Sequence, residues 1–292
     1  MTRSKPVQLV LLLLVGGVFW SYPVLAAFQL GTSRDAYTYT LLILPISATL
    51  IFLETREVVL PHESGKWIGA VLVSVALLLR ICTAWDPWHL SSMENLSTSI
   101  AGLVIWWIGC TLLCFGVDAF RAFLFPLCFL FLSVPMPEAA VNWITDLLQQ
   151  QSALASSVLF HVLGVPVVRD GVVLNVPGLT IQVAQECSSI RSSTMLIVVS
   201  LILAHLFLRS TWRKAVLVTL AFPLSILKNG IRIVTIAELG TRVNPAFLHG
   251  RLHRQGGVVF LSVALLLELI LLLVLRKGEA GSASQPGACP AE

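Results

Sequence analysis

The sequence predicts an all-α polytopic membrane protein with about eight transmembrane helices and a small extracytoplasmic β element. Hydrophobic residues make up 57% of the 292 residues and charged residues only 12%, whereas a soluble domain carries about 25% charged residues. The mean hydropathy is +0.88. In water such a chain would expose too much apolar surface, which excludes an ordinary soluble enzyme, a disordered chain and a collagen-like fibre. The net charge of +4 does not indicate a nucleic-acid partner; the expected surrounding is the lipid bilayer.

The helix count follows from apolar runs, since a spanning helix needs about 20 apolar residues. The eight predicted spans cover residues 7–28, 36–53, 67–85, 96–117, a stretch from the turn at 118–121 to residue 134, 188–208, 215–239 and 256–275. The first run follows a basic N-terminus and could instead be a signal peptide, because Leu25-Ala26-Ala27 loosely resembles a cleavage site. Leu25 suits such a site poorly, so we favour a retained first helix.

The chain between the fifth and sixth spans differs in kind. Prolines break the apolar run at 135–137, and residues 139–163 form a less lipophilic helix that lies along the interface or packs inside the bundle. The stretch 165–183 is rich in β-branched residues, which predicts short strands. Two turn pairs divide it, Asp170-Gly171 and Pro177-Gly178. An open sheet edge cannot face lipid, so this insert lies in water or against protein.

The predicted organisation has three parts. Residues 1–134 form an N-terminal five-helix membrane region, and residues 135–277 form a second membrane region that contains the β-rich insert 165–183. Residues 278–292, rich in Gly, Ser and Pro, are expected to form a disordered cytoplasmic tail.

Basic residues in the short loops indicate the orientation. With the N-terminus inside, ten of the 19 basic residues fall on the inner side: Arg3, Lys5, Arg56, Lys66, Arg121, Arg209, Arg213, Lys214, Arg276 and Lys277. Several of the other nine cluster around a polar site that function can explain. We therefore predict that both termini are cytoplasmic.

Three polar features are predicted to meet at the outer face. They are Gln185-Glu186-Cys187-Ser188-Ser189-Ile190-Arg191 at the start of the sixth span, Lys228-Asn229-Gly230-Ile231-Arg232 toward the outer end of the seventh, and residues 249–257 (HGRLHRQGG) before the eighth. Four of the other cysteines sit inside apolar runs and are expected to be packing residues: Cys82, Cys110, Cys114 and Cys128. Cys289 lies in the polar tail, which leaves Cys187 as the candidate nucleophile.

Cys187 lies at or just before a helix N-terminus, where the positive end of the helix dipole favours a thiolate. Glu186 opposes this effect, so a nearby cation is needed; Arg191, one turn on, and Arg232 are the candidates. A charge inside a span is costly, and Arg232 or the Asn229 amide could donate to an oxyanion. Two histidines, His249 and His253, precede the last span, and His253 could protonate a leaving amine. Lys228 is expected to be a snorkelling residue.

These motifs resemble the exosortase/archaeosortase family. The matching residues are Glu186-Cys187-Ser188-Ser189, Asn229-x-x-Arg232 and His253-x-x-x-Gly257 before the last apolar run. Their order and spacing match as well, and the resemblance is most specific over residues 135–275. In one departure, Ser189 stands where the family usually has Gly after Cys-Ser, which bears on the turn after the nucleophile and on substrate choice.

The resemblance implies a membrane-embedded cysteine transpeptidase that needs no cofactor. Its substrates would be membrane-anchored proteins with a C-terminal sorting tail: a short Pro-containing motif, a spanning helix and a basic end. Cys187 would form an acyl-enzyme, His253 would be the acid/base, and Arg232 would stabilise the oxyanion or position the substrate. The supporting or substrate-binding residues would be Glu186, Ser188, Arg191 and Asn229. An amine or another nucleophile would accept the acyl group.

The family resemblance also implies a link to exopolysaccharide production and surface attachment. It places the chain in the bacterial inner membrane, with the active site on the periplasmic face.

Three alternatives stay open. A cysteine intramembrane protease would hydrolyse the acyl-enzyme, and only the acceptor would differ. A polytopic transporter or exopolysaccharide export component would line a pathway with Arg80, Arg232 and Glu268, and would tolerate Cys187→Ala but not Glu268→Gln. A membrane scaffold for a glycan-synthesis complex would tolerate changes at all three candidate catalytic residues.

Overall fold

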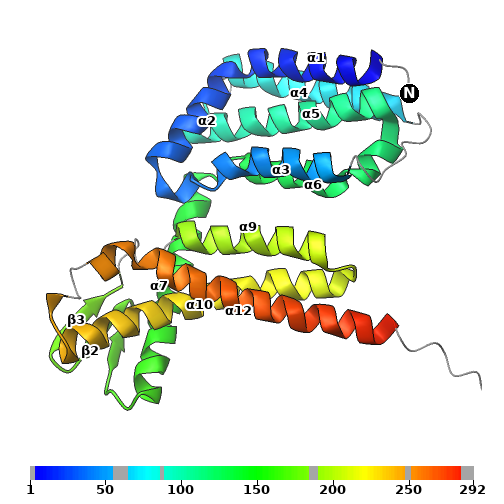
Figure 1. Ribbon diagram of the computed structural model, residues 1–292. Coiled ribbons are helices and arrows are strands. Elements are labelled where there is room, and N and C mark those ends of the chain that lie inside the picture. The colour runs from blue at the N-terminus through cyan, green and yellow to red at the C-terminus, as the bar shows by residue number, and fades with distance from the viewer. Residues whose placement is uncertain (1–3, 55–64, 86–88, 184–189, 247–250, 284–292) are drawn as a thin grey trace, which may run out of the picture. The chain divides into compact units, whose positions relative to one another are not determined.

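The computed structural model describes residues 4–54, 65–85, 89–183, 190–246 and 251–283 (Figure 1), with side chains except at 4–6, 251–256 and 280–283. The chain divides into two compact units, Met1–Val141 and Asn142–Glu292. Both units are built mainly from helices, and the second also contains a small sheet. The functional division predicted at 134/135 stays a prediction.

Helices form the first unit. They are α1 (Ser4–Phe19), α2 (Ser21–Ser33), the 3₁₀ turn η1 (Asp35–Tyr37), α3 (Thr40–Glu54), α4 (Lys66–Trp85), α5 (Ser92–Ala122), α6 (Leu124–Phe129), the 3₁₀ turn η2 (Leu130–Ser133) and the start of α7 (Glu138–Val162). The stretches Asp35–Glu54, Lys66–Trp85 and Ser92–Ala122 are each long and apolar enough to cross a membrane. This agrees with the second, third and fourth predicted spans.

The first apolar run is bent by 72° between α1 and α2. Trp20 at the bend is fully buried. Its indole Nε1 donates to the Ser99 carbonyl oxygen at 2.8 Å, and its ring lies 5.7 Å from that of Trp106. The prediction of one straight helix over 7–28 is therefore wrong, because contacts of Trp20 with α5 stabilise the bend.

A capping box begins α5. The Ser91 hydroxyl accepts from the Glu94 N–H at 3.2 Å, and the Glu94 carboxylate accepts from the Ser91 N–H at 3.1 Å, which satisfies two otherwise open donors. The helix then continues through Asp118 and Arg121, where the sequence predicted a turn. The interruption comes earlier, at Gly116, whose φ of 80° favours glycine.

The second unit joins most of α7 to three strands and three long helices. These elements are β1 (Val168–Asp170), β2 (Val173–Val176), β3 (Leu179–Gln182), α9 (Ile190–Phe207), α10 (Thr211–Arg242) and α12 (Arg251–Ala283). α7 agrees with the helix predicted over 139–163. α12 includes residues 278–283, which the sequence assigned to the tail.

The β element is an antiparallel meander in the order β1-β2-β3. Leu174 in the middle strand pairs with Arg169 on one side and with Ile181 on the other. The two tight turns contain Gly171 and Gly178, with φ of 57° and 80°. Glycine adopts such values without steric cost, so both turn pairs predicted from the sequence are confirmed.

The sheet packs against helices of its own unit rather than standing alone. Its buried side chains share one apolar cluster with residues of α7 and α10: Ala153, Phe160, Val165, Leu174, Val183, Ile233, Val234 and Ala237. The outer part of α10 is therefore enclosed by protein. This agrees with the expectation that the insert lies in water or against protein.

The described residues contain six helices long and apolar enough to cross a membrane, or up to eight spans if each of two bent pairs counts as one. The bent pairs are Val7–Phe19 with Ser21–Ser33, and Leu124–Ser133 with Glu138–Val162. The prediction of an all-α polytopic membrane protein with a small β element is thus confirmed.

Candidate active site

Three mutually packed helices carry or directly follow the candidate residues (Figure 1). α9 begins at Ile190, three residues after Cys187, and α10 carries Asn229 and Arg232. The backbone of His253 lies in the first turn of α12. Some candidates lie outside the described residues: Glu186, Cys187, Ser188, His249 and the side chain of His253.

One face of α10 buries three polar side chains. The exposed fraction is 5% for Lys228, 0% for Asn229 and 8% for Arg232. Residues three and four apart share a helix face, so Arg232 lies on the same face as both others. Burying such groups within a spanning helix is costly, which makes this face the strongest functional feature among the described residues.

Lys228 differs from the sequence-based expectation. A snorkelling side chain keeps its charged end in water. The Lys228 ammonium instead lies inside the unit and donates a hydrogen bond to the Ser192 hydroxyl of α9. This contact ties the polar face of α10 to the start of α9.

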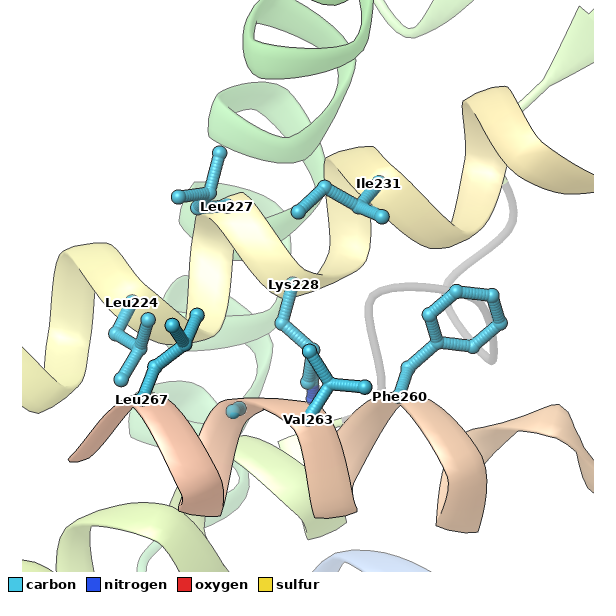
Figure 2. Close-up of a pocket in the computed structure, with 8 residues that line it drawn as sticks. Leu224, Leu227, Lys228, Ile231, Phe260, Val263 and Leu267 are labelled. Carbon is cyan, nitrogen blue, oxygen red and sulfur yellow. The ribbon is translucent and has the colours of Figure 1, made fainter. Parts of the chain in front are cut away.

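Lys228 also borders a narrow apolar cavity of about 10 Å³ between α10 and α12 (Figure 2). The other lining residues are apolar: Leu224, Leu227, Ile231, Phe260, Val263, Ala264 and Leu267. Leu227 and Val263 are 41% and 47% exposed, so the cavity opens at the surface of the helix pair. An apolar groove therefore adjoins the buried polar face.

Contacts between the three helices show which residues lie at the same position along the bundle axis. Ser192 contacts Lys228, and Phe260 lines the same cavity as Lys228. Arg232 is one turn beyond Lys228, about 6 Å along the axis, and His253 lies seven residues before Phe260, about 10 Å. Because α10 and α12 run in opposite directions, both displacements point toward the end where α9 begins. The start of α9, Arg232 and the backbone of His253 thus lie toward the same end of the three-helix bundle.

The described residues on either side of 184–189 are held by hydrogen bonds. Before it, the Val183 N–H donates to the Val172 carbonyl oxygen at 3.0 Å, and the Gln149 side chain of α7 donates to the Val183 carbonyl oxygen. After it, Ser192 is held by Lys228. The sequence marks Gln149 only as a polar residue in a weakly apolar helix, so this role was not predicted.

Arg191 occupies a different side of α9 from the buried face. Its side chain is exposed, whereas the neighbouring Ser192 and Ser193 are buried. The structure thus brings Asn229, Arg232 and Lys228 onto one buried face and leaves Arg191 at the surface. The expected pairing of Arg191 with Cys187 lies outside the described residues.

The groups assigned to a transport pathway have structural partners. Glu268 is 1% exposed and contacts the Ser200 hydroxyl, which joins α12 to α9. Arg80, in the first unit, donates from Nε to the Phe19 carbonyl oxygen at 3.3 Å and lies 5.6 Å from the Phe19 ring centroid.

Cys110 and Cys114 are buried, as expected of packing residues, and Cys82 is half-buried. Cys128 is exposed on α6, so the expectation that it packs in the interior is wrong. Within the described ranges, no group of three His, Cys, Asp or Glu side chains is placed to hold a metal ion.

Comparison with known families gives one match. The sequence matches the family described as Transmembrane exosortase (Exosortase_EpsH) over residues 31–270. No curated protein and no solved structure matches the chain. The match covers well over half of the sequence and includes the motifs at Cys187, Arg232 and His253. The chain therefore belongs to the transmembrane exosortase family.

Proposed function

We propose that this exosortase cleaves a C-terminal sorting tail through an acyl-enzyme on Cys187 and transfers the product to an acceptor. As a family member, the chain is a multi-pass membrane protein that acts in general as a sorting transpeptidase. The burial of Asn229 and Arg232 on α10, a helix that packs against α9, carries the finer proposal. Preorganised donors in a water-poor site are what an acyl-transfer oxyanion needs.

In the proposed reaction, the Cys187 thiolate attacks the carbonyl carbon of the scissile peptide bond, and the carbonyl oxygen becomes an oxyanion. Arg232, supported by Asn229, donates hydrogen bonds to this oxygen. His253 protonates the departing amine as the C–N bond breaks, which leaves a thioester on Cys187. His253 then takes a proton from the acceptor as that nucleophile attacks and the thiolate leaves.

Three further residues support these steps. Glu186 and Ser188 flank the nucleophile, and we assign them to substrate binding or to orienting the thiolate. Arg191 lies in the first turn of α9, and its side chain is exposed. Arg191 therefore contributes to substrate positioning in this proposal rather than to the bond-breaking step.

The proposed substrates are membrane-anchored proteins whose tail has a Pro-containing motif, a spanning helix and a basic end. A spanning substrate helix can lie against the protein's own helices, with its cleavage site at the end of the bundle where α9 begins. We place the protein in a bacterial inner membrane, with this end periplasmic, both termini cytoplasmic and a role linked to exopolysaccharide and surface attachment. The proposed chemistry needs no cofactor.

A processing assay tests the proposal. The chain is co-expressed with reporters that carry candidate Pro-containing motifs, a spanning helix and a basic end, and tail removal is followed by mass change. We expect wild type to remove the tail and Cys187→Ala to leave it intact, with a thioester adduct on Cys187 of the wild type. Cys128→Ala is the matched control, because it removes an exposed thiol from the first unit.

Adding hydroxylamine separates transfer from hydrolysis, because an acyl-enzyme open to amines yields the hydroxamate. If Cys187→Ala processes the reporter as well as wild type, the nucleophile assignment is wrong. If the only product is the free acid, even with hydroxylamine, the enzyme is a hydrolase.

Glu268 separates this proposal from the transport alternative. Gln at this position can still hydrogen-bond to Ser200, so Glu268→Gln is expected to keep processing within about threefold of wild type. A transport pathway that needs the carboxyl group would fail with this variant and would tolerate Cys187→Ala. The measurement is the same processing assay, run on membranes with matched protein levels.

A further inference from the structure

Basic side chains gather at the end of the second unit opposite to the candidate active site. Here the turn between α9 and α10 meets the last turns of α12 around an open cavity of about 1130 Å³. Arg209, Arg213, Lys214 and Arg276 line this cavity. Glu279 is the only acidic residue among its described lining residues, so positive charge dominates.

This cavity lies beside the adjoining ends of two candidate spans. α9 ends at Phe207 and α10 begins at Thr211, and both are candidate spans. Phe207 and Trp212 flank the turn and are 44% and 60% exposed. Exposed aromatic rings at the ends of spans mark the headgroup region of a membrane. The basic cavity therefore opens where lipid phosphates lie.

Two of the arginines, Arg213 and Arg276, are oriented by contacts within the protein. Arg213 donates from Nη1 to the Leu275 carbonyl oxygen at 3.0 Å, which joins α10 to α12. Its guanidinium lies 5.4 Å from the Trp212 ring, and that of Arg276 lies 6.0 Å from the Phe207 ring. Stacking on aromatic rings orients a guanidinium while leaving its other N–H groups available to a phosphate.

Glu279 does not neutralise the cavity. Its carboxylate accepts hydrogen bonds from the backbone N–H groups of Ser210 at 2.8 Å and Arg209 at 3.2 Å. It thus satisfies amides at the start of α10. Four basic side chains against one acidic side chain still leave an excess of positive charge.

We propose that this cavity binds the headgroup phosphate of an anionic phospholipid. Basic side chains from two helix ends converge on it, and basic pockets between spanning helices suit phospholipid headgroups. Leu206 and Phe207 continue from the cavity into the exposed apolar surface of α9 and provide a path for acyl chains. Such a lipid would bridge α9, α10 and α12 at the end remote from the candidate active site, independently of the reaction proposed above.

The test uses the purified full-length protein in detergent, titrated with phosphatidylglycerol or phosphatidylcholine and measured by native mass spectrometry. We expect wild type to retain phosphatidylglycerol in preference to phosphatidylcholine. Lys214→Gln and Arg276→Gln should each weaken this binding about fivefold, the effect of one basic side chain near a lipid surface. Arg169→Gln removes an exposed positive charge from β1 and should leave binding unchanged.

A variant that is expected to strengthen lipid binding complements these two. Glu279→Gln keeps an oxygen for the amides of α10 but removes the negative charge, so phosphatidylglycerol should bind about fivefold more tightly. Phosphatidylglycerol should also raise the melting temperature of wild type more than that of Arg276→Gln. Equal binding of the two lipids, equal binding by wild type and Arg276→Gln, or inorganic phosphate binding as tightly as the lipid would overturn the proposal.

Discussion

At the scale of single residues, the buried face of α10 combines two cations with an amide. Lys228 and Arg232 lie one turn apart on a spanning helix, and their positive charges repel each other. The hydroxyl of Ser192 accepts a hydrogen bond from Lys228. A protein keeps such an arrangement in a membrane only at a cost, so the polar face is better explained by function than by stability.

The guanidinium of Arg232 is the first residue to test. Arg232→Lys keeps the charge but loses the planar fork of N–H donors, and losing one oxyanion donor reduces the rate about 100-fold or more. We expect this loss in reporter processing, with unchanged expression and melting temperature. Arg242→Lys is the control on the same helix, where Arg242 pairs with Glu238 at 2.7 Å and is exposed. Normal processing by Arg232→Lys would contradict the assigned role.

The Lys228–Ser192 hydrogen bond predicts that removing the acceptor destabilises the protein more than removing the donor. Ser192→Ala leaves a buried ammonium without its acceptor and should lower the free energy of unfolding by about 1–3 kcal/mol. Lys228→Met removes the charge and with it the need for an acceptor, so it should change the free energy of unfolding little. In the Lys228→Met background, Ser192→Ala should then lower the free energy of unfolding only slightly. Unfolding by denaturant in detergent measures all three variants.

Ser262→Ala is the control for this pair, because the Ser262 hydroxyl is exposed and bonds only within its own helix, to Val258. An equal loss of stability from Ser192→Ala in both backgrounds would show that the hydroxyl does not act on Lys228.

Sequence reasoning identified Asn229 and Arg232 from the cost of polar groups in a span. It misjudged Lys228, because whether a lysine snorkels or turns inward depends on the neighbouring helix.

At the scale of helices and strands, sequence reasoning succeeded where local chemistry decides the structure. The turns at Gly171 and Gly178 need positive φ, and the turn pairs in the sequence mark both. The bend at Trp20 could not be predicted, because Ser99 and Trp106 come from a distant segment. Hydropathy likewise locates α5 but not its interruption at Gly116, since glycine is also common within straight spanning helices.

The crossing of α4 and α5 depends on glycine. A Cβ atom on Gly69 would lie 2.7 Å from the Leu113 nitrogen and 2.8 Å from the Gly109 oxygen, both backbone atoms. Small residues let spanning helices approach in this way. Gly69→Ala must push the helices apart, and we expect it to lower the free energy of unfolding by about 1–3 kcal/mol.

Gly17→Ala on α1 is the matched control, because no atom lies within 4 Å of the added Cβ. It should be neutral or slightly stabilising, since alanine favours a helix over glycine by about 0.5–1 kcal/mol. Unfolding of both variants under the same detergent conditions gives the comparison. Equal effects would mean that the close approach of α4 and α5 adds nothing to stability.

At the scale of the whole molecule, the two ends of the helices in the second unit differ: the β element lies at one end and a basic cavity at the other. Three candidate spans separate the β element from the C-terminus: Ile190–Phe207, Thr211–Arg242 and Gly257–Glu279. If each of the three crosses the membrane, the sheet and the end of α12 lie on opposite sides of it. The cavity lined by Arg209, Arg213, Lys214 and Arg276 lies at the C-terminal end. From the positive-inside rule we predict that this end is cytoplasmic, and therefore that the sheet and the candidate active site are periplasmic.

Protease access tests this orientation in cells. A protease site is inserted at Gly171, in a tight turn where a Cβ atom would meet nothing within 4 Å, and an epitope tag is added after the C-terminus. In spheroplasts, external protease should cut the turn and leave the tag intact, whereas permeabilised cells should lose both. Retained processing activity before protease treatment shows that the insertion is tolerated. A protected turn with an accessible tag would invert the orientation, and would move both the candidate active site and the basic cavity to the opposite leaflets.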